Sequence, residues 1–344
     1  MFLNKHLLFS WAVGVGGGGL LFLQEIPLAW LLGSMLATSL AAMMGLQITT
    51  FVRLTPWARC VLGAMVGTGF EAVTFQEFVG YGSTIIFVPV FLVLATSINY
   101  HLLKRLFSLD PRTALFSALP GGMVEMVTSG RDVGADVKML TTVHLIRVVT
   151  IVAGASAIGT LVGVEDLRMQ TPTIDNYEYV LLHLALGYVG WKVLAVFRVP
   201  SAPLIGPMFF VAALQGFDIL HLKLFTPLLI LAQVMIGIDI ARAFCGVSIG
   251  SMRTAVLAGL TSVMAMALVL GGCALFLTAL VNDLPWVQII LSFLPGGQTE
   301  LALLAFAMKL DLPFVVTHQI FRIALIMFAL PLLMIWVNRL MKKE

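Results

Sequence analysis

Long apolar runs dominate the chain, and short stretches that hold most of the charged side chains separate them. A run of about 20 predominantly apolar residues is long enough to cross a bilayer as one α-helix. The pattern therefore predicts an all-α protein made of membrane helices. The predicted helices cover residues 7–24, 27–46, 55–74, 79–103, 112–130, 136–162, 179–198, 201–217, 224–243, 252–281, 286–308 and 312–337.

Composition supports a polytopic membrane protein and excludes several other classes. Of the 344 residues, 60% are hydrophobic and only 11% are charged, against about a quarter charged in soluble domains. The mean hydropathy is +1.03. No polar segment is long enough to form a nucleic-acid-binding module. We expect a multi-pass membrane protein, with residues 1–23 kept as its first helix rather than cleaved as a signal peptide.

A Pro-Gly-Gly break interrupts two of the predicted helices. Residues 119–125 read Leu-Pro-Gly-Gly-Met-Val-Glu, and residues 294–300 read Leu-Pro-Gly-Gly-Gln-Thr-Glu. Proline removes a backbone donor and the two glycines loosen the helix. In lipid an unpaired backbone group costs several kcal/mol, so such a break persists only inside protein or beside a water-filled cavity.

The two breaks belong to an internal duplication. Residues 119–147 align without gaps on residues 294–322, and eight of these 29 positions are identical. A weaker match at an offset of 173 relates Gly33 to Gly206 and Met35 to Met208, and Gly67 pairs loosely with Gly237. We predict one membrane repeat over 1–163, a linker over 164–178 and a second repeat over 179–344.

The positions of positive charge predict that the two repeats are inverted. If each Pro-Gly-Gly element enters and leaves the membrane on one side, every basic cluster falls on the cytoplasmic side and the acidic linker falls outside. About ten transmembrane helices and two re-entrant helices follow from this assignment. A broken helix that does cross is the main rival. The basic clusters are Arg53/Arg59, Lys104/Arg105/Arg112, Arg131/Lys138, Lys192/Arg198, Arg242/Arg253 and Arg339/Lys342/Lys343.

Glu125 and Glu300 are the candidate coupling-ion residues, because each follows the first glycine of a break by four positions. Inverted repeats whose interrupted helices meet near the midplane are typical of secondary transporters. We expect the two carboxylates to face one another and to share a proton or hold Na⁺. The alternative is that each neutralises Arg147 or Arg322 in a static ion pair.

The remaining candidate residues are predicted to contact solute. Arg147 and Arg322 have a guanidinium that can hold a carboxylate, but anchoring Asp136 or Asp311, or snorkelling to the interface, is an equal alternative. Asp136 and Asp311 themselves are expected to cap helices. The second break is the more polar, which predicts that specificity lies there. The predicted solute-binding residues are Gly121, Gly122, Gly296, Gly297, Gln298, Thr299, Arg147 and Arg322.

The paired Leu-Pro-Gly-Gly-x-x-Glu elements, each followed by an Asp and then an Arg, resemble the AbrB-duplication family of bacterial inner-membrane proteins. The resemblance covers essentially the whole chain as two tandem copies. Members carry labels as transporters, regulators of gene expression or ammonia monooxygenases. The resemblance therefore implies the location and the duplicated architecture more than an activity.

We therefore predict a secondary transporter of a small anionic solute, coupled to H⁺ or Na⁺. A membrane-embedded regulator that acts through a partner protein is the alternative. An enzyme is not expected, because no metal-ligand spacing, nucleophile elbow or nucleotide loop occurs. No cofactor and no nucleic acid are expected. The expected partners are the solute or ion, membrane lipid and, as in many such folds, a second copy of the chain.

Overall fold

The computed structural model describes residues 5–26, 28–68, 80–161, 180–197, 201–217, 219, 225–245, 253–281, 284–296 and 298–341. Within helices, the side chains of residues 124, 125, 156, 159–161, 183, 216, 299 and 336–341 are not described. The described parts form helices joined by turns and short loops, with no strand among them. The predicted all-α class is confirmed, and the predicted linker 164–178 lies outside the described residues.

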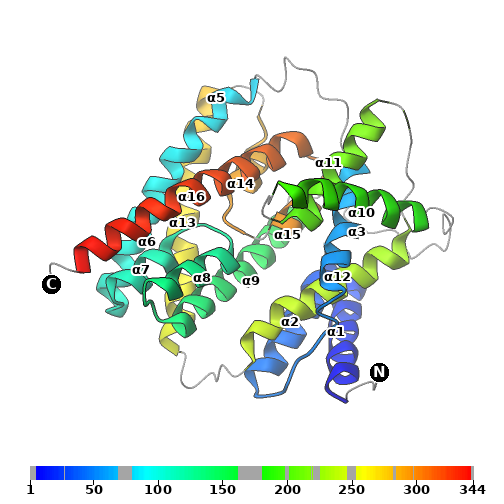
Figure 1. Ribbon diagram of the computed structural model, residues 1–344, viewed down its shortest axis with the longest axis horizontal. Helices are drawn as coiled ribbons and strands as arrows, with labels where there is room; N and C mark the ends of the chain where they lie inside the picture. The colour runs from blue at the N-terminus through cyan, green and yellow to red at the C-terminus, as the bar shows by residue number, and fades with distance from the viewer. Residues whose placement is uncertain are drawn as a thin grey trace. The chain divides into compact units, whose positions relative to one another are not determined.

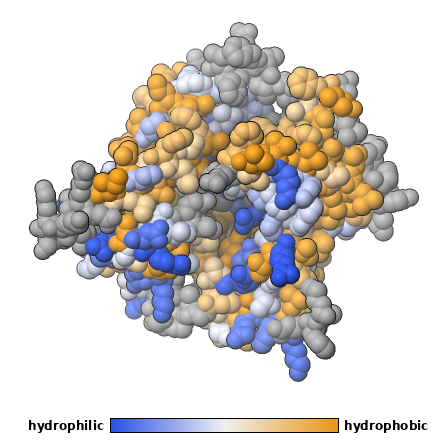
Figure 2. Space-filling view, viewed as in Figure 1, coloured by the Kyte–Doolittle hydropathy of each residue, from blue (hydrophilic) through white to orange (hydrophobic). Residues whose placement is uncertain are grey.

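Six of the described helical segments are long and apolar enough to cross a membrane. Large apolar side chains such as Leu268, Leu275 and Phe328 are 74%, 76% and 82% exposed, and Figure 2 shows apolar residues over much of the visible surface. A surface of this kind suits lipid and indicates a membrane protein. The six segments are Lys5–Leu23, Gly82–Phe107, Val137–Ala155, Thr226–Phe244, Arg253–Leu280 and Leu312–Ile335.

The helices group into two compact units, and each unit takes segments from both sides of the predicted linker. Unit 1 comprises Met1–Thr74, Ala153–Ser248 and Thr299–Leu312, and unit 2 comprises Phe75–Val152, Ile249–Gln298 and Pro313–Glu344. The helices of unit 1 are α1 (Lys5–Leu23), α2 (Ala29–Met43), α3 (Thr55–Thr68), α10 (Val180–Val196), α11 (Ala202–Gly216), α12 (Thr226–Ala241), the short 3-10 helix η3 (Arg242–Phe244) and nearly all of α15 (Gln298–Ala307).

Unit 2 holds the long helices that surround the first break (Figure 1). Its helices are α5 (Gly82–Ile85), α6 (Phe87–Phe107), α7 (Pro111–Ala118), α8 (Met123–Asp132), most of α9 (Val137–Leu161), α13 (Arg253–Leu280), α14 (Trp286–Phe293) and α16 (Leu312–Met341). One apolar core joins α6, α13 and α14, where the rings of Phe91 and Phe293 meet edge to face with centroids 5.8 Å apart. Another, with Phe116 and Met126, joins α7, α8, α9 and α16.

Glycines let the helices of unit 1 touch backbone to backbone. A Cβ atom on Gly17 of α1 would lie 2.4 Å from the carbonyl oxygen of Gly33 of α2. A Cβ atom on Gly190 of α10 would lie 2.5 Å from the carbonyl oxygen of Gly206 of α11. No larger residue fits at such distances, so these glycines fix how closely each pair of helices packs.

Glycines also mediate two further contacts between helices of unit 1. Gly237 of α12 lies against α2, where an added Cβ would be 2.8 Å from the carbonyl oxygen of Leu31. Gly63 of α3 lies against α11, where the corresponding distance to the carbonyl oxygen of Leu204 is 2.2 Å. Helices α2 and α11 therefore each lie between two neighbours that approach through glycine.

Replacing Gly33 or Gly206 by alanine should destabilise the protein by about 1–3 kcal/mol, because the added methyl group must push two helix backbones apart. The measurement is thermal unfolding of the purified chain in detergent. Gly16→Ala is the matched control, since a Cβ there meets nothing within 4 Å. An equal melting temperature for all three variants would contradict this packing.

Candidate functional site

The first break separates α7 from α8. Asp110 begins α7 by accepting hydrogen bonds from the backbone N–H groups of Arg112 and Thr113, with Pro111 at the first helical position. The helix ends at Ala118 because Leu119, which precedes Pro120, is extended (φ −63°, ψ 128°). Gly122 is extended as well, and α8 starts at Met123.

The second break repeats this backbone geometry. Helix α14 ends at Phe293, and Leu294 before Pro295 is extended with φ −60° and ψ 125°. Helix α15 starts at Gln298. The predicted interruptions are therefore confirmed at both Pro-Gly-Gly elements. Gly297 lies outside the described residues.

Two buried arginines hold the ends of the interrupted helices. Arg147 of α9 is 1% exposed and donates to the carbonyl oxygens of Leu119 (3.0 Å), Gly121 (3.3 Å) and Ser117 (3.4 Å). The last carbonyls of a helix have no partner within the helix and carry its negative dipole end. We call this arrangement of a guanidinium on helix-end carbonyls a guanidinium cap.

Arg322 of α16 makes the second guanidinium cap. It is 2% exposed and donates to the carbonyl oxygens of Phe293 (3.0 Å) and Leu294. Gln319, one turn earlier, donates from Nε2 to the carbonyl oxygen of Leu291 at 3.1 Å. Leu119 and Leu294 are equivalent in the duplication, as are Arg147 and Arg322, so both breaks are stabilised in the same way.

The sequence matches a known protein family. A sequence model described as "Transition state regulatory protein AbrB" matches residues 30–338, which is most of the chain. The chain belongs to the AbrB family. It is 25% identical to "Putative regulator AbrB" of Escherichia coli (strain K12), with 89% of each chain covered.

A Bacillus subtilis (strain 168) relative, "Uncharacterized protein YhjN", is 23% identical, with 96% of this chain and 92% of the relative covered. No solved structure matches the chain. The predicted family is therefore confirmed, and the names of these relatives do not establish an activity.

The guanidinium caps show what the two arginines of this AbrB-family chain bind inside the protein. Their described hydrogen bonds all go to backbone carbonyls. The predicted anchoring of Asp136 is not seen, since its carboxylate instead accepts from the backbone N–H groups of Lys138 and Met139 at the start of α9. That is the capping role expected for Asp136. Asp311 directly precedes α16.

Each arginine also keeps an unused donor. The Nε–H groups of Arg147 and Arg322 have no hydrogen-bond partner among the described residues, and no described side chain forms an ion pair with either guanidinium. A buried charge without a counter-charge is costly in a medium of low dielectric. Both groups lie in unit 2, where the charge of Arg322 acts on Arg147. The described residues therefore bring two buried guanidinium groups into unit 2.

The two glutamates occupy equivalent positions in the half-helices after the breaks. Glu125 is the third residue of α8, and its side chain is not described. Glu300 is the third residue of α15 and is 5% exposed. Arg59 of α3, in the same unit, attracts the Glu300 carboxylate. The sequence marked Arg59 only as a topology signal, so this contribution was missed.

The other predicted solute-binding residues lie at or just before the starts of α8 and α15. Gly121 and Gly122 lie between α7 and α8, and Gly296 follows Pro295. Gln298, the first residue of α15, is half-buried, and the side chain of Thr299 is not described. How the two breaks lie relative to one another stays a prediction.

Several buried polar side chains of unit 2 were not predicted. Leu103, Ala114, Ala118, Val143 and Ala258 pack in one apolar cluster from α6, α7, α9 and α13. Asn99, Ser117, Arg147 and Ser262 are each three or four residues from a member of this cluster, which places them on the same side of their helices. All four are at most 1% exposed. The Oδ1 atom of Asn99 and the Oγ atoms of both serines have no described partner.

The buried histidines have different environments. His318 lies in α16, and its two ring nitrogens contact the carbonyl oxygen of Phe314 (2.7 Å) and the hydroxyl of Thr84 (2.9 Å). His144 contacts the carbonyl oxygen of Leu140 through Nδ1, while its Nε2 has no described partner. The contacts of His318 are those of a buried polar side chain held within the helix bundle. Among the described residues, no His/Cys/Asp/Glu cluster suits a metal ion.

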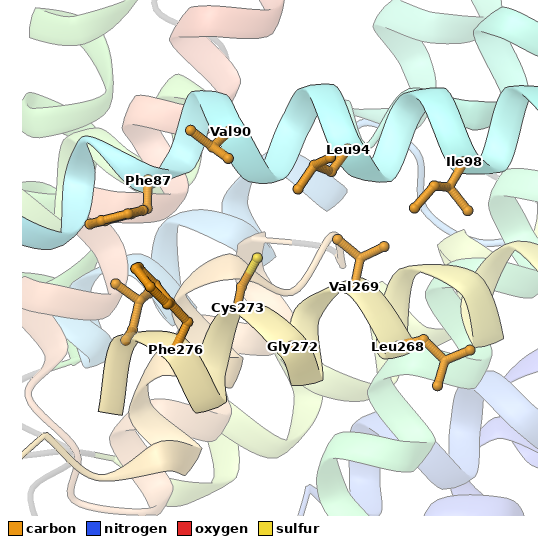
Figure 3. Close-up of a pocket in the computed structure, with 10 residues that line it drawn as sticks. Phe87, Val90, Leu94, Ile98, Leu268, Val269, Gly272, Cys273 and Phe276 are labelled. Carbon is orange, nitrogen blue, oxygen red and sulfur yellow. The ribbon is translucent and has the colours of Figure 1, made fainter. Parts of the chain in front are cut away.

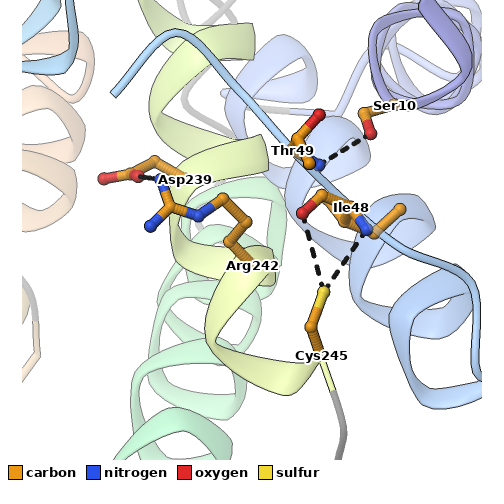
Figure 4. A network of polar contacts seen from close by, with 6 residues as sticks. All are labelled: Ser10, Ile48, Thr49, Asp239, Arg242 and Cys245. Atoms are coloured by element: carbon orange, nitrogen blue, oxygen red, sulfur yellow. Dashed lines mark hydrogen bonds and ion pairs between the residues drawn. The ribbon is translucent and has the colours of Figure 1, made fainter. Parts of the chain in front are cut away.

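Asp239 and Arg242 form an ion pair, with 3.2 Å between Oδ1 and Nη1 (Figure 4). Both side chains are partly exposed, at 20% and 34%. Nearby, Cys245 contacts the backbone of Ile48, and the N–H of Thr49 donates to Ser10 at 2.9 Å. These contacts tie α1 and the segment after α2 to the end of α12, which is a structural role.

Replacing Arg322 by methionine should destabilise the protein by about 1–3 kcal/mol for each carbonyl left unpaired, because a buried acceptor without a partner pays its full desolvation cost. Thermal unfolding in detergent measures the change. Arg131→Met, at the exposed end of α8, should leave the melting temperature nearly unchanged. An Arg322→Met protein as stable as the control variant would show that the guanidinium cap contributes nothing.

Proposed function

We propose that this AbrB-family chain is a secondary transporter of the bacterial inner membrane that carries a small anionic solute, coupled to H⁺ or Na⁺. The observation that supports it is the pair of guanidinium caps, each made by a buried arginine at an interrupted helix. Irregular backbone inside a membrane is tolerated where it lines a cavity, and transporters use it for binding.

Electrostatics at the breaks favour an anion. The end of α7 contributes about half a negative charge and the start of α8 about half a positive charge, so the two dipoles nearly cancel. The guanidinium of Arg147 then leaves the first break with a net positive charge. The same reasoning applies to Arg322 at the end of α14. The unused Nε–H groups supply hydrogen bonds to an oxyanion.

The recurring packing of unit 1 supports the proposed inverted repeat. Gly17 and Gly190, Gly33 and Gly206, and Leu31 and Leu204 are all related by the offset of 173, and each makes the same kind of contact as its counterpart. We propose ten transmembrane helices and two re-entrant elements. The first element enters from the cytoplasm and the second from outside, as the positive charges indicate.

Glu125 and Glu300 are the proposed coupling residues. A carboxylate in the membrane interior is costly, so binding H⁺ or Na⁺ there stabilises the loaded form. Binding of H⁺ or Na⁺ at the glutamates also removes negative charge from the proposed site, which favours binding of the anion. Solute and coupling ion would therefore bind together and leave together.

The proposed solute contacts are Gly121, Gly122, Gly296, Gly297, Gln298 and Thr299 with the two arginines. The buried side chains of Asn99, Ser117 and Ser262 have unpartnered polar atoms among the described residues, and we propose that they add donors and an acceptor to the same site. These groups suit a solute that has polar atoms in addition to its charge. They would also add hydrogen-bonding groups to the proposed site at the first break, whereas the sequence predicted that specificity lies at the second break.

A regulator that acts through a partner protein is the second candidate. The observation in its favour is that the Escherichia coli relative is named a regulator. Such a protein would bind a cytoplasmic partner and move no solute. Flux measurements on the purified chain separate the two functions, since a regulator would give the same signal as empty vesicles.

Glu300→Gln should abolish gradient-driven uptake while leaving solute exchange intact, because an amide resembles the ion-loaded carboxyl group but cannot release the ion. In proteoliposomes, radiolabelled small carboxylates, phosphate and sulfate are tested with the wild type under imposed H⁺ and Na⁺ gradients. For the transported anion, the variant should lose at least about tenfold in gradient-driven uptake.

Asp132→Asn is the matched control, because this acid is exposed at the end of α8. It should transport like the wild type. Equal gradient-driven uptake by Glu300→Gln and the wild type would remove Glu300 from the coupling mechanism. Absence of flux for every anion in the panel would count against the transporter itself.

A further inference from the structure

An apolar groove runs between α6 and α13 on the outer side of unit 2 (Figure 3). It has a volume of about 460 Å³, and Phe87, Val90, Leu94 and Ile98 line it from α6. From α13 come Leu268, Val269, Gly272, Cys273, Phe276 and Leu277. The two helices touch along their inner sides through Phe91 and Leu270, and the groove opens where they diverge outward.

An aromatic pair spans one end of the groove, and aliphatic side chains stand at the other, which we call the open end. The rings of Phe87 and Phe276 meet edge to face at the first end, with centroids 5.5 Å apart. At the other end stand Ile98 and Leu268, which are 42% and 74% exposed. Gly272 lies between these ends, and a Cβ atom there would meet nothing within 4 Å. The absence of a side chain at Gly272 therefore keeps the middle of the groove open.

The open end leads to a group of positive charges. The groove residues of α6 recur every three or four positions, and continuing that spacing from Ile98 places His101 and Arg105 on the same side of the helix. Both are exposed, as is Lys104. Helix α13 runs antiparallel, because its later residue Phe276 meets Phe87 near the start of α6.

Arg253 consequently starts α13 at the same end, where Leu103 and Ala258 pack together. Asp110, the acid in the following turn, is engaged in capping α7. The open end of the groove therefore carries an excess of positive charge.

We propose that the groove binds one acyl chain of an anionic phospholipid, with the phosphate held by Arg105, Lys104 and Arg253. An acyl chain is the apolar, extended occupant that a membrane supplies, and the basic end selects lipids with a negative headgroup. This site is separate from the helix breaks and does not depend on the transport proposal.

The dimensions fit one leaflet. The twelve residues from Phe87 to Ile98 span about 16 Å, at a rise of about 1.5 Å for each of eleven steps, which is about half of a 30 Å hydrocarbon core. Arg105 lies two helical turns beyond Ile98. Its long side chain can extend along the helix surface to meet a phosphate in the headgroup layer.

Native mass spectrometry and thermal unfolding of the full chain in neutral detergent test the site. Phosphatidylglycerol and phosphatidylcholine with identical acyl chains are added in parallel. We expect phosphatidylglycerol to remain bound and to raise the melting temperature by at least about 5 °C, while phosphatidylcholine has little effect. Equal retention of the two lipids by the wild type would overturn the proposal.

Two substitutions separate the acyl-chain site from the headgroup site. Gly272→Leu fills the groove and should remove the stabilisation by phosphatidylglycerol, whereas Gly271→Leu, its neighbour outside the groove lining, should keep it. Arg105→Gln should reduce phosphatidylglycerol to the level of phosphatidylcholine.

Retention of phosphatidylglycerol by Gly272→Leu at the wild-type level would contradict the acyl-chain site. A lipid-free dimer that Gly272→Leu converts to monomers would assign the groove to a second copy of the chain and overturn the lipid assignment.

Discussion

The hydrogen bonds from Arg147 and Arg322 to helix-end carbonyls are the interactions on which the rest of the structure depends. A helix interrupted within lipid exposes backbone groups that water cannot reach, at a cost of several kcal/mol each. Each arginine satisfies carbonyls at the point where Leu119 or Leu294 leaves the helix. The breaks can therefore persist in the protein interior, where Pro-Gly-Gly would otherwise be a defect.

Among the described residues, the same interactions leave one donor of each guanidinium unused, and the proposed function builds on these donors. The carbonyls neutralise a helix dipole but only part of a guanidinium, and the Nε–H groups remain available. Asn99, Ser117 and Ser262 add further buried polar groups to unit 2. Unit 1 has a different character, because backbone contacts at Gly17, Gly33, Gly190 and Gly206 fix its helix pairs. We regard unit 1 as a packed scaffold and the first break as the polar centre of unit 2.

The sequence predicted the helices well because apolar runs and their Pro, Gly and charged boundaries encode them locally. It located both breaks, and it foresaw that Asp136 caps α9. It could not assign Arg147 and Arg322, because their acceptors are backbone atoms 26 to 30 residues away that leave no trace in residue identity. Asn99 was detectable as a lone amide in an apolar helix, whereas Ser262 and Arg59 became relevant only through packing.

The most direct test of the central claim is the membrane side from which each broken helix can be reached. Arg131→Cys at the end of α8 and Lys309→Cys after α15 are introduced into a chain whose three native cysteines are replaced by alanine. A membrane-impermeant thiol reagent is then applied to right-side-out and inside-out vesicles. Two inverted, re-entrant breaks predict labelling of position 131 only from the cytoplasmic side and of position 309 only from outside. Labelling of both positions from the same side would contradict the account.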